Sequence, residues 1–183
     1  GHGRTNSERQ SVLLEAQEAK LIAESTEVLT KGHGTRPRGW LSPWIAESLA
    51  TPDLLKEAGY DYTLNWAMDD QPVWMRTKHG PLLSIPYPQE ANDIPSIVGR
   101  KDTGQDFANI VRENFDEMLE QSVDQPLVMG IALHPYLVGQ PYRLRALRRV
   151  LQHICAHRDD IWITTAGEIY DFCATCDAIP KPD

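Results

Sequence analysis

The chain has 183 residues, which is enough for one domain with a substantial core, and no shift in composition divides it. Its 26 acidic side chains outnumber 18 basic ones, and the net charge of −8 disfavours nucleic acid and anionic lipid as partners. No apolar run approaches the roughly 18 residues that cross a bilayer, and no signal-peptide pattern is present. We therefore predict a single domain over residues 1–183 that binds neither nucleic acid nor a membrane.

The chain has three cysteines. An odd number argues against a disulfide framework and for a reducing compartment, so we expect a cytoplasmic protein. Cys173 and Cys176 form one CxxC pair, but the sequence holds no second pair that would complete a zinc site. We predict free thiols at a helix end.

Helical patterns dominate the first 60 residues. Residues 7–32 carry apolar side chains at helical spacing, including Val12 and Ala16, and Gly32 is the predicted C-cap. A loop rich in glycine and proline follows. Two short helical stretches are then predicted over about 45–49 and 52–58.

Extended patterns come next. Residues 60–65, "YDYTLN", alternate as a strand does. Two β-type runs, "PVWMRT" (72–77) and "GPLLSIPY" (80–87), flank the short segment "KHG". This arrangement predicts a hairpin.

A polar segment over residues 88–104 is predicted to be a long loop. It leads into the strongest helical pattern of the chain, whose apolar stripe runs from Phe107 to Leu119. The apolar run "PLVMGIAL" (126–133) is typical of a strand buried on both faces, and it ends at His134.

The remaining chain reads as a helix with an apolar stripe over 144–154, a strand over 160–165 and a last helix over 166–174. Strands alternate with helices, and polar residues follow the carboxyl ends of the strands. This order predicts an α/β barrel, or a layered α/β domain, whose site lies at that end of the strands.

His134 is the first candidate for chemistry. It follows the carboxyl end of the predicted buried strand, where barrel enzymes place catalytic side chains, and imidazole titrates near neutral pH. Such a histidine suits general acid or base catalysis. A structural role in capping a loop fits the same position equally well, so position alone does not decide between the two.

Two acids, Asp69 and Asp70, follow the predicted strand over 60–65 and lie close in sequence to Trp66 and Trp74. Adjacent acids in a loop are usually solvated. The aromatic neighbours favour a second interpretation, because a binding pocket combines apolar walls with a few polar anchors.

The segment "TRPRGWLSPW" offers another such wall, with Arg36, Arg38 and Trp40. His153 and His157 are spaced i, i+4, but no third ligand lies near them in the sequence. We predict that these two histidines lie on the surface and hold no metal.

Five segments, taken in order, resemble the successive motifs of a known family. They are "GHGRTNSERQ", "RPRGWLSP", "YDYTLNWAMDDQPVW", "GIALHPYLVGQPYRLRAL" and "WITTAGEIYDF". The family is that of the polysaccharide deacetylases (NodB homology), and the resemblance is to the branch that contains the cofactor-independent allantoinase. It runs from His2 to about Phe172, and its most specific part is "LHPYLVGQPYRLRAL" together with "DDQPVW".

The resemblance implies a distorted (β/α) barrel that hydrolyses an amide C–N bond. The substrate would be the N-acetyl group of a sugar or a cyclic ureide such as allantoin. In this family a late histidine acts as the acid, and it matches His134. Metal-dependent members bind zinc or a similar ion through an aspartate and an H-x3-H pair, whose first histidine matches His2. A second aspartate acts as the base.

Two departures from the family pattern matter. Asn6 stands where the second histidine of the pair is expected, and it is a weak ligand for zinc. The aspartate motif of the family would lie before Gly1, so we expect this chain to be the C-terminal part of a barrel that lacks its first strands. Two cofactor states stay open: no cofactor, or a divalent metal held in part by His2.

The resemblance also implies which residues would contact the substrate. One of the two arginines, with the acid pair and Asn6, would orient polar substrate groups, and two tryptophans would supply apolar walls. These predicted substrate-binding residues are Arg36, Arg38, Trp40, Asp69, Asp70, Trp74 and Asn6.

Two functions remain in competition. The first is a C–N hydrolase of carbohydrate or ureide metabolism, with cyclic amides slightly favoured over N-acetyl sugars because Asn6 weakens the metal site. The second is a barrel that binds a saccharide or ureide without catalysis, or a fragment that is inactive by itself. We also expect a homo-oligomer, with the segment 88–104 as a candidate for subunit contacts.

Overall fold

The computed structural model describes residues 9–176 and 179–182, so His2 and Asn6 lie outside the described residues. The chain divides into two compact units, which are described separately. Unit 1 comprises the described residues up to Met68, together with Pro72–Ile85 and those from Thr165 onward. Unit 2 comprises Asp69–Gln71 and Pro86–Thr164. The division leaves the single-domain expectation for residues 1–183 a prediction.

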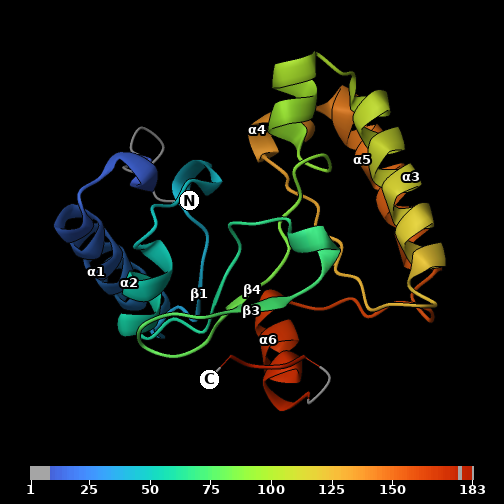
Figure 1. Cartoon of the computed structure of the whole chain (residues 1–183). Coiled ribbons are helices and arrows are strands. Elements are labelled where there is room, and N and C mark those ends of the chain that lie inside the picture. The colour runs from blue at the N-terminus through green and yellow to red at the C-terminus, as the bar shows by residue number, and fades with distance from the viewer. Residues whose placement is uncertain (1–8, 177–178, 183) are drawn as a thin grey trace. The chain divides into compact units, whose positions relative to one another are not determined.

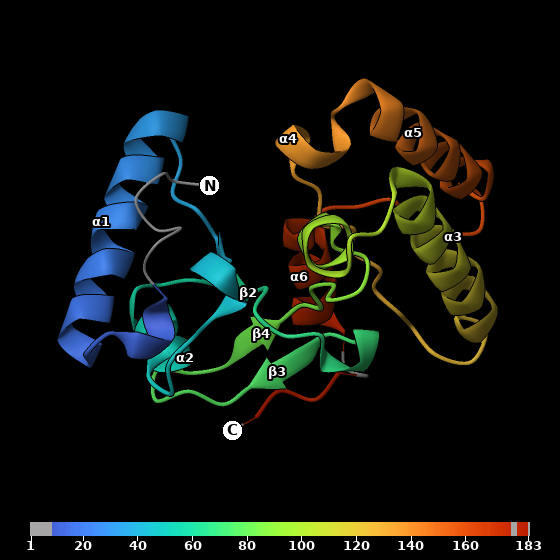
Figure 2. The same cartoon turned by 90° about the horizontal axis from the view of Figure 1, so that it is seen from above.

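A four-stranded sheet forms the centre of unit 1, with the strand order β1-β2-β4-β3 (Figures 1 and 2). Strands β1, β2 and β4 run parallel, and β3 pairs antiparallel with β4. The strands are β1 (Gly39–Trp40), β2 (Tyr62–Thr63), β3 (Val73–Met75) and β4 (Leu82–Ser84). The predicted hairpin is therefore confirmed, and Gly80 in its turn has a φ of 110° that glycine adopts without strain.

Two helices, α1 (Glu15–His33) and α2 (Thr51–Glu57), pack with the sheet of unit 1. Their shared apolar core comprises Ile22, Trp40, Leu54, Leu55, Tyr60 and Leu82. A third helix, α6 (Ala166–Thr175), places the ring of Tyr170 against those of Tyr62 and Trp74. The mixed α/β character expected from the alternating pattern is confirmed.

The first helix differs from its prediction. It begins at Glu15, because Leu13 and Leu14 are extended and separate it from a 3-10 turn at Gln10–Val12. It ends at His33, and its C-cap is Gly34, whose φ of 75° is left-handed, and not Gly32. The buried face consists of Glu18, Ile22 and Thr26, whereas the predicted face includes Val12 and Ala16, which are exposed.

Unit 2 is built around two long helices, α3 (Gly104–Gln121) and α5 (Pro141–Ala156), which lie side by side in both views (Figures 1 and 2). Phe107, Val111, Leu147 and Val150 belong to their shared core. The start of α3 is a capping box in which Thr103 accepts a hydrogen bond from the Asp106 amide and the Asp106 carboxylate accepts one from the Thr103 amide.

Three further predictions on unit 2 and its flank need correction. Residues 126–133 form no strand, and within the described part of the chain their one ladder contact is the parallel bridge between Asn92 and Ala132. Residues 160–165 form no strand either, and Trp162 and Ile163 are exposed. The segment 88–104 is not a structureless loop, since a π-helix, η4 (Ile94–Arg100), lies within it.

Three other short elements complete the described structure. They are α4 (Pro135–Val138), the 3-10 turn η2 (Pro43–Ile45) and the 3-10 turn η3 (Met68–Asp70). The helix predicted over 45–49 is replaced by η2, because Trp44 and Ile45 have left-handed backbone angles that a continuous helix excludes. No described helix is both long and apolar enough to cross a membrane.

Candidate active site

The clearest chemical arrangement in unit 2 joins His134 to Asp93. The imidazole Nδ1 lies 2.6 Å from Asp93 Oδ1, and the backbone N–H of His134 donates to Oδ2 at 2.6 Å. The carboxylate therefore binds the histidine at two points, at its ring and at its main chain. The side chain of His134 remains 34% exposed, while Asp93 is fully buried.

Backbone pairing brings these two residues together although they are far apart in sequence. The amide of Ala132 donates to the carbonyl of Ala91 at 2.9 Å, and the amide of Asp93 donates to the carbonyl of Ala132 at 3.1 Å. His134 then begins the short helix α4, and its carbonyl accepts from the amide of Leu137 at 2.8 Å. The position of the imidazole is thus set by the main chain on both sides.

The charge of Asp93 acts on its surroundings. Burial first, and the nearby Asp93 carboxylate second, raise the pKa of Tyr87. An ionised carboxylate only accepts hydrogen bonds, so the hydrogen in the ring contact belongs to Nδ1 of His134. Within the described residues no hydrogen bond is made by Nε2, which leaves this nitrogen available.

This geometry is suited to proton transfer. A carboxylate on Nδ1 fixes the tautomer and the ring orientation, and it stabilises the imidazolium when Nε2 takes up a proton. The ring of Tyr136 contacts that of His134 edge-on, with 5.8 Å between centroids. His134 can therefore act as a general acid or base.

Asp93 was not among the residues predicted from the sequence. It lies in a polar segment, where an aspartate carries no pattern that separates a buried carboxylate from a solvated one. Its burial depends on the pairing of Asn92 with Ala132, a contact between segments 40 residues apart. Neither hydrophobic periodicity nor the family motifs quoted above point to it.

Asp69 and Asp70 are exposed, and both have left-handed backbone angles, with φ of 52° and 57°. The carbonyl of Asp70 accepts from the amide of Val128 at 2.8 Å. Partial burial raises the pKa of the Asp70 carboxyl, with smaller contributions from the charges of Glu90 and Asp69. These acids repel one another, and their predicted role as substrate contacts stays a prediction.

Arg38 lies immediately before β1, at the amino end of the parallel strands of unit 1. Its Nε donates to Asp61 at 2.7 Å, and its two terminal nitrogens bind both oxygens of Asp171 at 2.7 and 3.3 Å. The guanidinium also lies over the ring of Tyr170, 5.2 Å from its centroid. These contacts join the strand region to α6 and favour a structural role.

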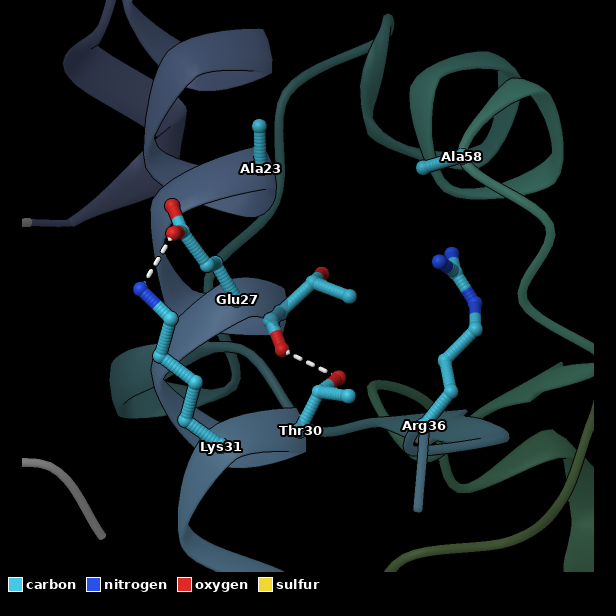
Figure 3. A pocket seen from close by; sticks show the side chains of 7 residues that line it. Ala23, Glu27, Thr30, Lys31, Arg36 and Ala58 are labelled. Atoms are coloured by element: carbon cyan, nitrogen blue, oxygen red, sulfur yellow. Dashed lines mark hydrogen bonds and ion pairs between the residues drawn. The ribbon is translucent and has the colours of Figure 1, made fainter. Parts of the chain in front are cut away.

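Arg36 also precedes β1 and lies 5.5 Å from the centroid of the Tyr60 ring. It points into an open pocket of about 540 Å³ that helix α1 lines on the other side (Figure 3). Glu27 and Lys31 form an ion pair on that helix at 2.5 Å. The structure thus places both arginines before β1, away from the loops that follow the strands.

The two tryptophans predicted as pocket walls are buried in unit 1. Trp40 is 5% exposed, and its Nε1 donates to Gln10 and Ser42, each at 3.0 Å. Trp74 is 8% exposed and packs edge-on against Tyr170. Both rings pack with neighbouring side chains of unit 1, and their contact with a substrate stays a prediction.

A metal site was also tested against the side chains present. Within residues 9–176 and 179–182, no three His, Cys, Asp or Glu side chains are grouped to hold an ion. His153 and His157 are partly exposed at the surface, with side chains 34% and 37% exposed, and both rings pack on Phe115. His153 Nε2 lies 2.5 Å from Asp116 Oδ1. The described residues therefore do not fit a metal.

Comparison with known proteins connects this chain to a family. A protein of Schizosaccharomyces pombe, named "Putative polysaccharide deacetylase", is 29% identical over 167 residues, which are 81% of this chain and 51% of that protein. The solved structure of the PuuE allantoinase superposes with a TM-score of 0.83 at 30% identity and covers 91% of this chain and 56% of the allantoinase chain. The chain is a relative of the polysaccharide deacetylases. The predicted resemblance and fold class are thereby confirmed.

A second curated relative, a peptidoglycan deacetylase of Helicobacter pylori, is 23% identical over 178 residues, covering 81% of this chain and 61% of that protein. No protein-family model matches the sequence. The chain spans about half the length of the first relative and about three fifths of the second.

Proposed function

We propose that this chain supplies the proton-transfer part of a hydrolase that cleaves amide C–N bonds. The observation that carries the proposal is the histidine held twice by a buried carboxylate, with Nε2 of His134 available. The named relatives, two deacetylases and an allantoinase, support the same class of reaction.

The chemistry follows from the leaving group. Hydrolysis adds the oxygen of water to the carbonyl carbon, and the C–N bond then breaks. An amide nitrogen leaves poorly as an anion, so it must take up a proton as the bond breaks. Protonated Nε2 of His134 gives that proton, and Asp93 holds the ring through Nδ1 during the transfer. The imidazole then regains a proton from solvent.

The group that activates water is not assigned among the described residues. The resemblance gives that role to an aspartate, and the described side chains do not form a metal site.

Two classes of neutral amide fit the proposed reaction as substrates. A cyclic ureide such as allantoin is favoured, because the allantoinase matches this chain at 30% identity and Asn6 weakens the predicted metal pair. An N-acetyl sugar is the alternative, supported by the names of the curated relatives. A cytoplasmic location and a homo-oligomeric state stay expectations beside this proposal.

The test uses the full-length protein and both substrates, allantoin and an N-acetylglucosamine oligomer. Replacing His134 by Ala should lower kcat by about 100-fold to 10,000-fold, the usual contribution of a general acid. The matched control is His79→Ala, which removes an exposed imidazole of unit 1 and should leave kcat unchanged.

Two results would contradict the proposal. One is full activity of the His134→Ala variant on the better substrate. The other is a wild-type protein that binds one of these molecules and hydrolyses neither, which would favour the non-catalytic binding barrel instead.

A further inference from the structure

A second polar arrangement lies in unit 1, where two loops leave the carboxyl ends of β1 and β2. These strands are parallel neighbours, so both loops start at the same edge of the sheet. The first loop carries Ser42 and Glu47, and the second carries Asn65 and Trp66. These four residues, the Glu47 cluster, are joined by hydrogen bonds.

Asn65 is the fixed centre of the Glu47 cluster. It is 4% exposed, and its Oδ1 accepts from the backbone N–H of Ser42 at 2.8 Å. This contact sets the orientation of the amide, so that Nδ2 can donate to Ser42 Oγ at 2.9 Å and to Glu47 Oε2 at 2.6 Å. Both hydrogens of Nδ2 are therefore used, and Asn65 serves to hold Glu47.

Glu47 is half-buried and receives one donor on each carboxylate oxygen. Asn65 Nδ2 binds Oε2, and Trp66 Nε1 donates to Oε1 at 2.8 Å. Each oxygen of a carboxylate accepts about two hydrogen bonds, so one acceptor position remains on each. Of the Lys and Arg side chains that the structure describes, none forms an ion pair with Glu47.

A half-buried carboxylate with only neutral donors is costly unless further donors complete it. The two remaining acceptor positions lie on the two oxygens of one planar group. They match a ligand that presents two adjacent N–H or O–H donors. An open urea group, such as the ureido side chain of allantoin, and a sugar with vicinal hydroxyls both have this chemistry.

Trp66 supplies an apolar surface beside the carboxylate. Trp66 is 47% exposed, and its Nε1 donates to Glu47. A ring anchored at one edge keeps its face in a fixed orientation, and flat or weakly polar ligand rings stack on such faces. Binding sites commonly pair an apolar wall of this kind with a single charged anchor.

The backbone that leads to Glu47 is strained. Trp44 and Ile45 have φ of 60° and 48°, which are left-handed values. For Ile45, a β-branched residue, this conformation is a genuine outlier. Strain of this kind persists where the surrounding structure over-determines it, and it concentrates at ligand-binding sites.

We infer that the Glu47 cluster is a binding subsite of unit 1 for a neutral ligand with two adjacent hydrogen-bond donors. Glu47 accepts both donors, Asn65 and Trp66 hold the carboxylate, and the indole face covers the ligand ring. The inference rests on the proposed function only for the choice of probes, since ureides and N-acetyl sugars both present such donors.

The experiment measures equilibrium binding to the full-length protein by titration calorimetry, with allantoin as the ureide probe and N-acetylglucosamine as the sugar probe. Both are measured in a His134→Ala background, so that turnover does not interfere. Replacing Glu47 by Gln should weaken binding of the preferred probe by about tenfold or more, because a charged acceptor is replaced by a neutral one. Whichever probe binds identifies the source of the donors.

A methylated probe separates a contact from a structural effect. 1,3-Dimethylhydantoin has no N–H donor, so the Glu47→Gln change should leave its binding unchanged. Glu27→Gln, which alters an exposed carboxylate of α1, is the matched control for charge and should affect neither probe. Trp66→Phe keeps a ring but removes the donor to Glu47, and it should weaken the donor-bearing probe about threefold to tenfold.

Unfolding midpoints of all variants show whether each one folds. If Glu47→Gln does not fold, Trp66→Phe carries the test. The inference is overturned if the folded variants bind allantoin and N-acetylglucosamine as well as their parent does, or if neither probe binds the parent. Failure of hydrolysis by the wild-type protein, measured separately, would overturn the proposed function and leave this binding result standing.

Discussion

Each unit holds an arrangement in which carboxylates bind a basic side chain, and the two arrangements leave different atoms available. In unit 2, Asp93 holds His134 and leaves Nε2 without a described partner. In unit 1, the guanidinium of Arg38 is divided between the carboxylates of Asp61 and Asp171. Both arrangements connect segments that are distant in sequence.

The difference between them lies in what remains available. The Arg38 guanidinium already binds three carboxylate oxygens and lies over a tyrosine ring, so little of it is left for a substrate. The histidine is held at one nitrogen and presents the other. The count of unused donors and acceptors therefore separates a structural charge from a reactive one better than the type of residue does.

The largest effect that would test this comparison is expected for Asp93→Asn. The backbone N–H of His134 needs an oxygen, so the amide NH₂ must face Nδ1. Nδ1 then becomes an acceptor, the hydrogen moves to Nε2, and the imidazolium loses its counter-charge. We expect kcat on the better substrate to fall by about 100-fold or more.

The control for this prediction is stability. The shape of the side chain is retained, so the unfolding midpoint should shift far less than in an Asp93→Leu variant, which leaves the part-buried His134 amide without an acceptor. A kcat within a factor of about three of wild type, in a folded Asp93→Asn variant, would refute the assignment of Asp93 as the residue that positions His134.

For Arg38→Met we expect a smaller effect, and we expect it on the stability of the fold rather than on catalysis. This change removes two exposed ion pairs, and solvent screening limits their contribution to about 1 kcal/mol or less. The unfolding midpoint should fall by a few degrees, while kcat/KM stays within about twofold of wild type. A loss of kcat/KM beyond tenfold would return Arg38 to the substrate-binding residues predicted from the sequence.

The sequence predicts those elements whose signal is local. Helices α3 and α5 have strong apolar stripes, and α3 begins with the Thr103 and Asp106 capping box. The β3–β4 hairpin has two β-type runs around a turn glycine. In each case neighbouring residues determine the structure, so periodicity and turn chemistry are sufficient.

The strands predicted over 126–133 and 160–165 show where this approach fails. A buried strand needs hydrogen-bonded neighbours, and in the part of the chain that the structure describes the first segment has only the bridge at Ala132. An apolar run alone does not reveal whether such neighbours exist. The helix α1 fails in a related way, because its buried face includes Glu18, which accepts hydrogen bonds from Gln10 and Ser48.

The residues of the candidate site also divide into those with a local sequence signal and those that depend on distant contacts. His134 is a candidate that the sequence itself supplies, because it combines a titratable side chain with a family motif, and its catalytic role stays a prediction. Asp93 could not be found in this way, since its burial depends on a contact across 41 residues. The predicted substrate contact of Arg38 stays a prediction, and its position before β1 and its carboxylate partners are visible only in the folded chain.

The smallest expected effect is the pH dependence of the stability of the folded state. The charged groups of the two units should contribute to it with opposite signs. Arg38 lowers the pKa of the Asp171 carboxyl below its usual value, so this ion pair stabilises the folded state at neutral pH. The stabilisation is lost as pH falls below about 4, through the lowered pKa of Asp171. Asp70 behaves in the reverse way, because its pKa is raised by burial and by Glu90, and protonation relieves its repulsion.

The two contributions can be separated by comparing unfolding midpoints of the wild type and Arg38→Met between pH 7 and pH 2.5. The gap between them should be constant from pH 7 to about pH 5 and should close below about pH 4, because the variant lacks the ion pair that protonation of Asp171 removes. The contribution of Asp70 is common to both proteins and cancels in the gap. A gap that stays constant down to pH 2.5 would mean that Arg38 stabilises unit 1 through its packing on Tyr170 rather than through its charge.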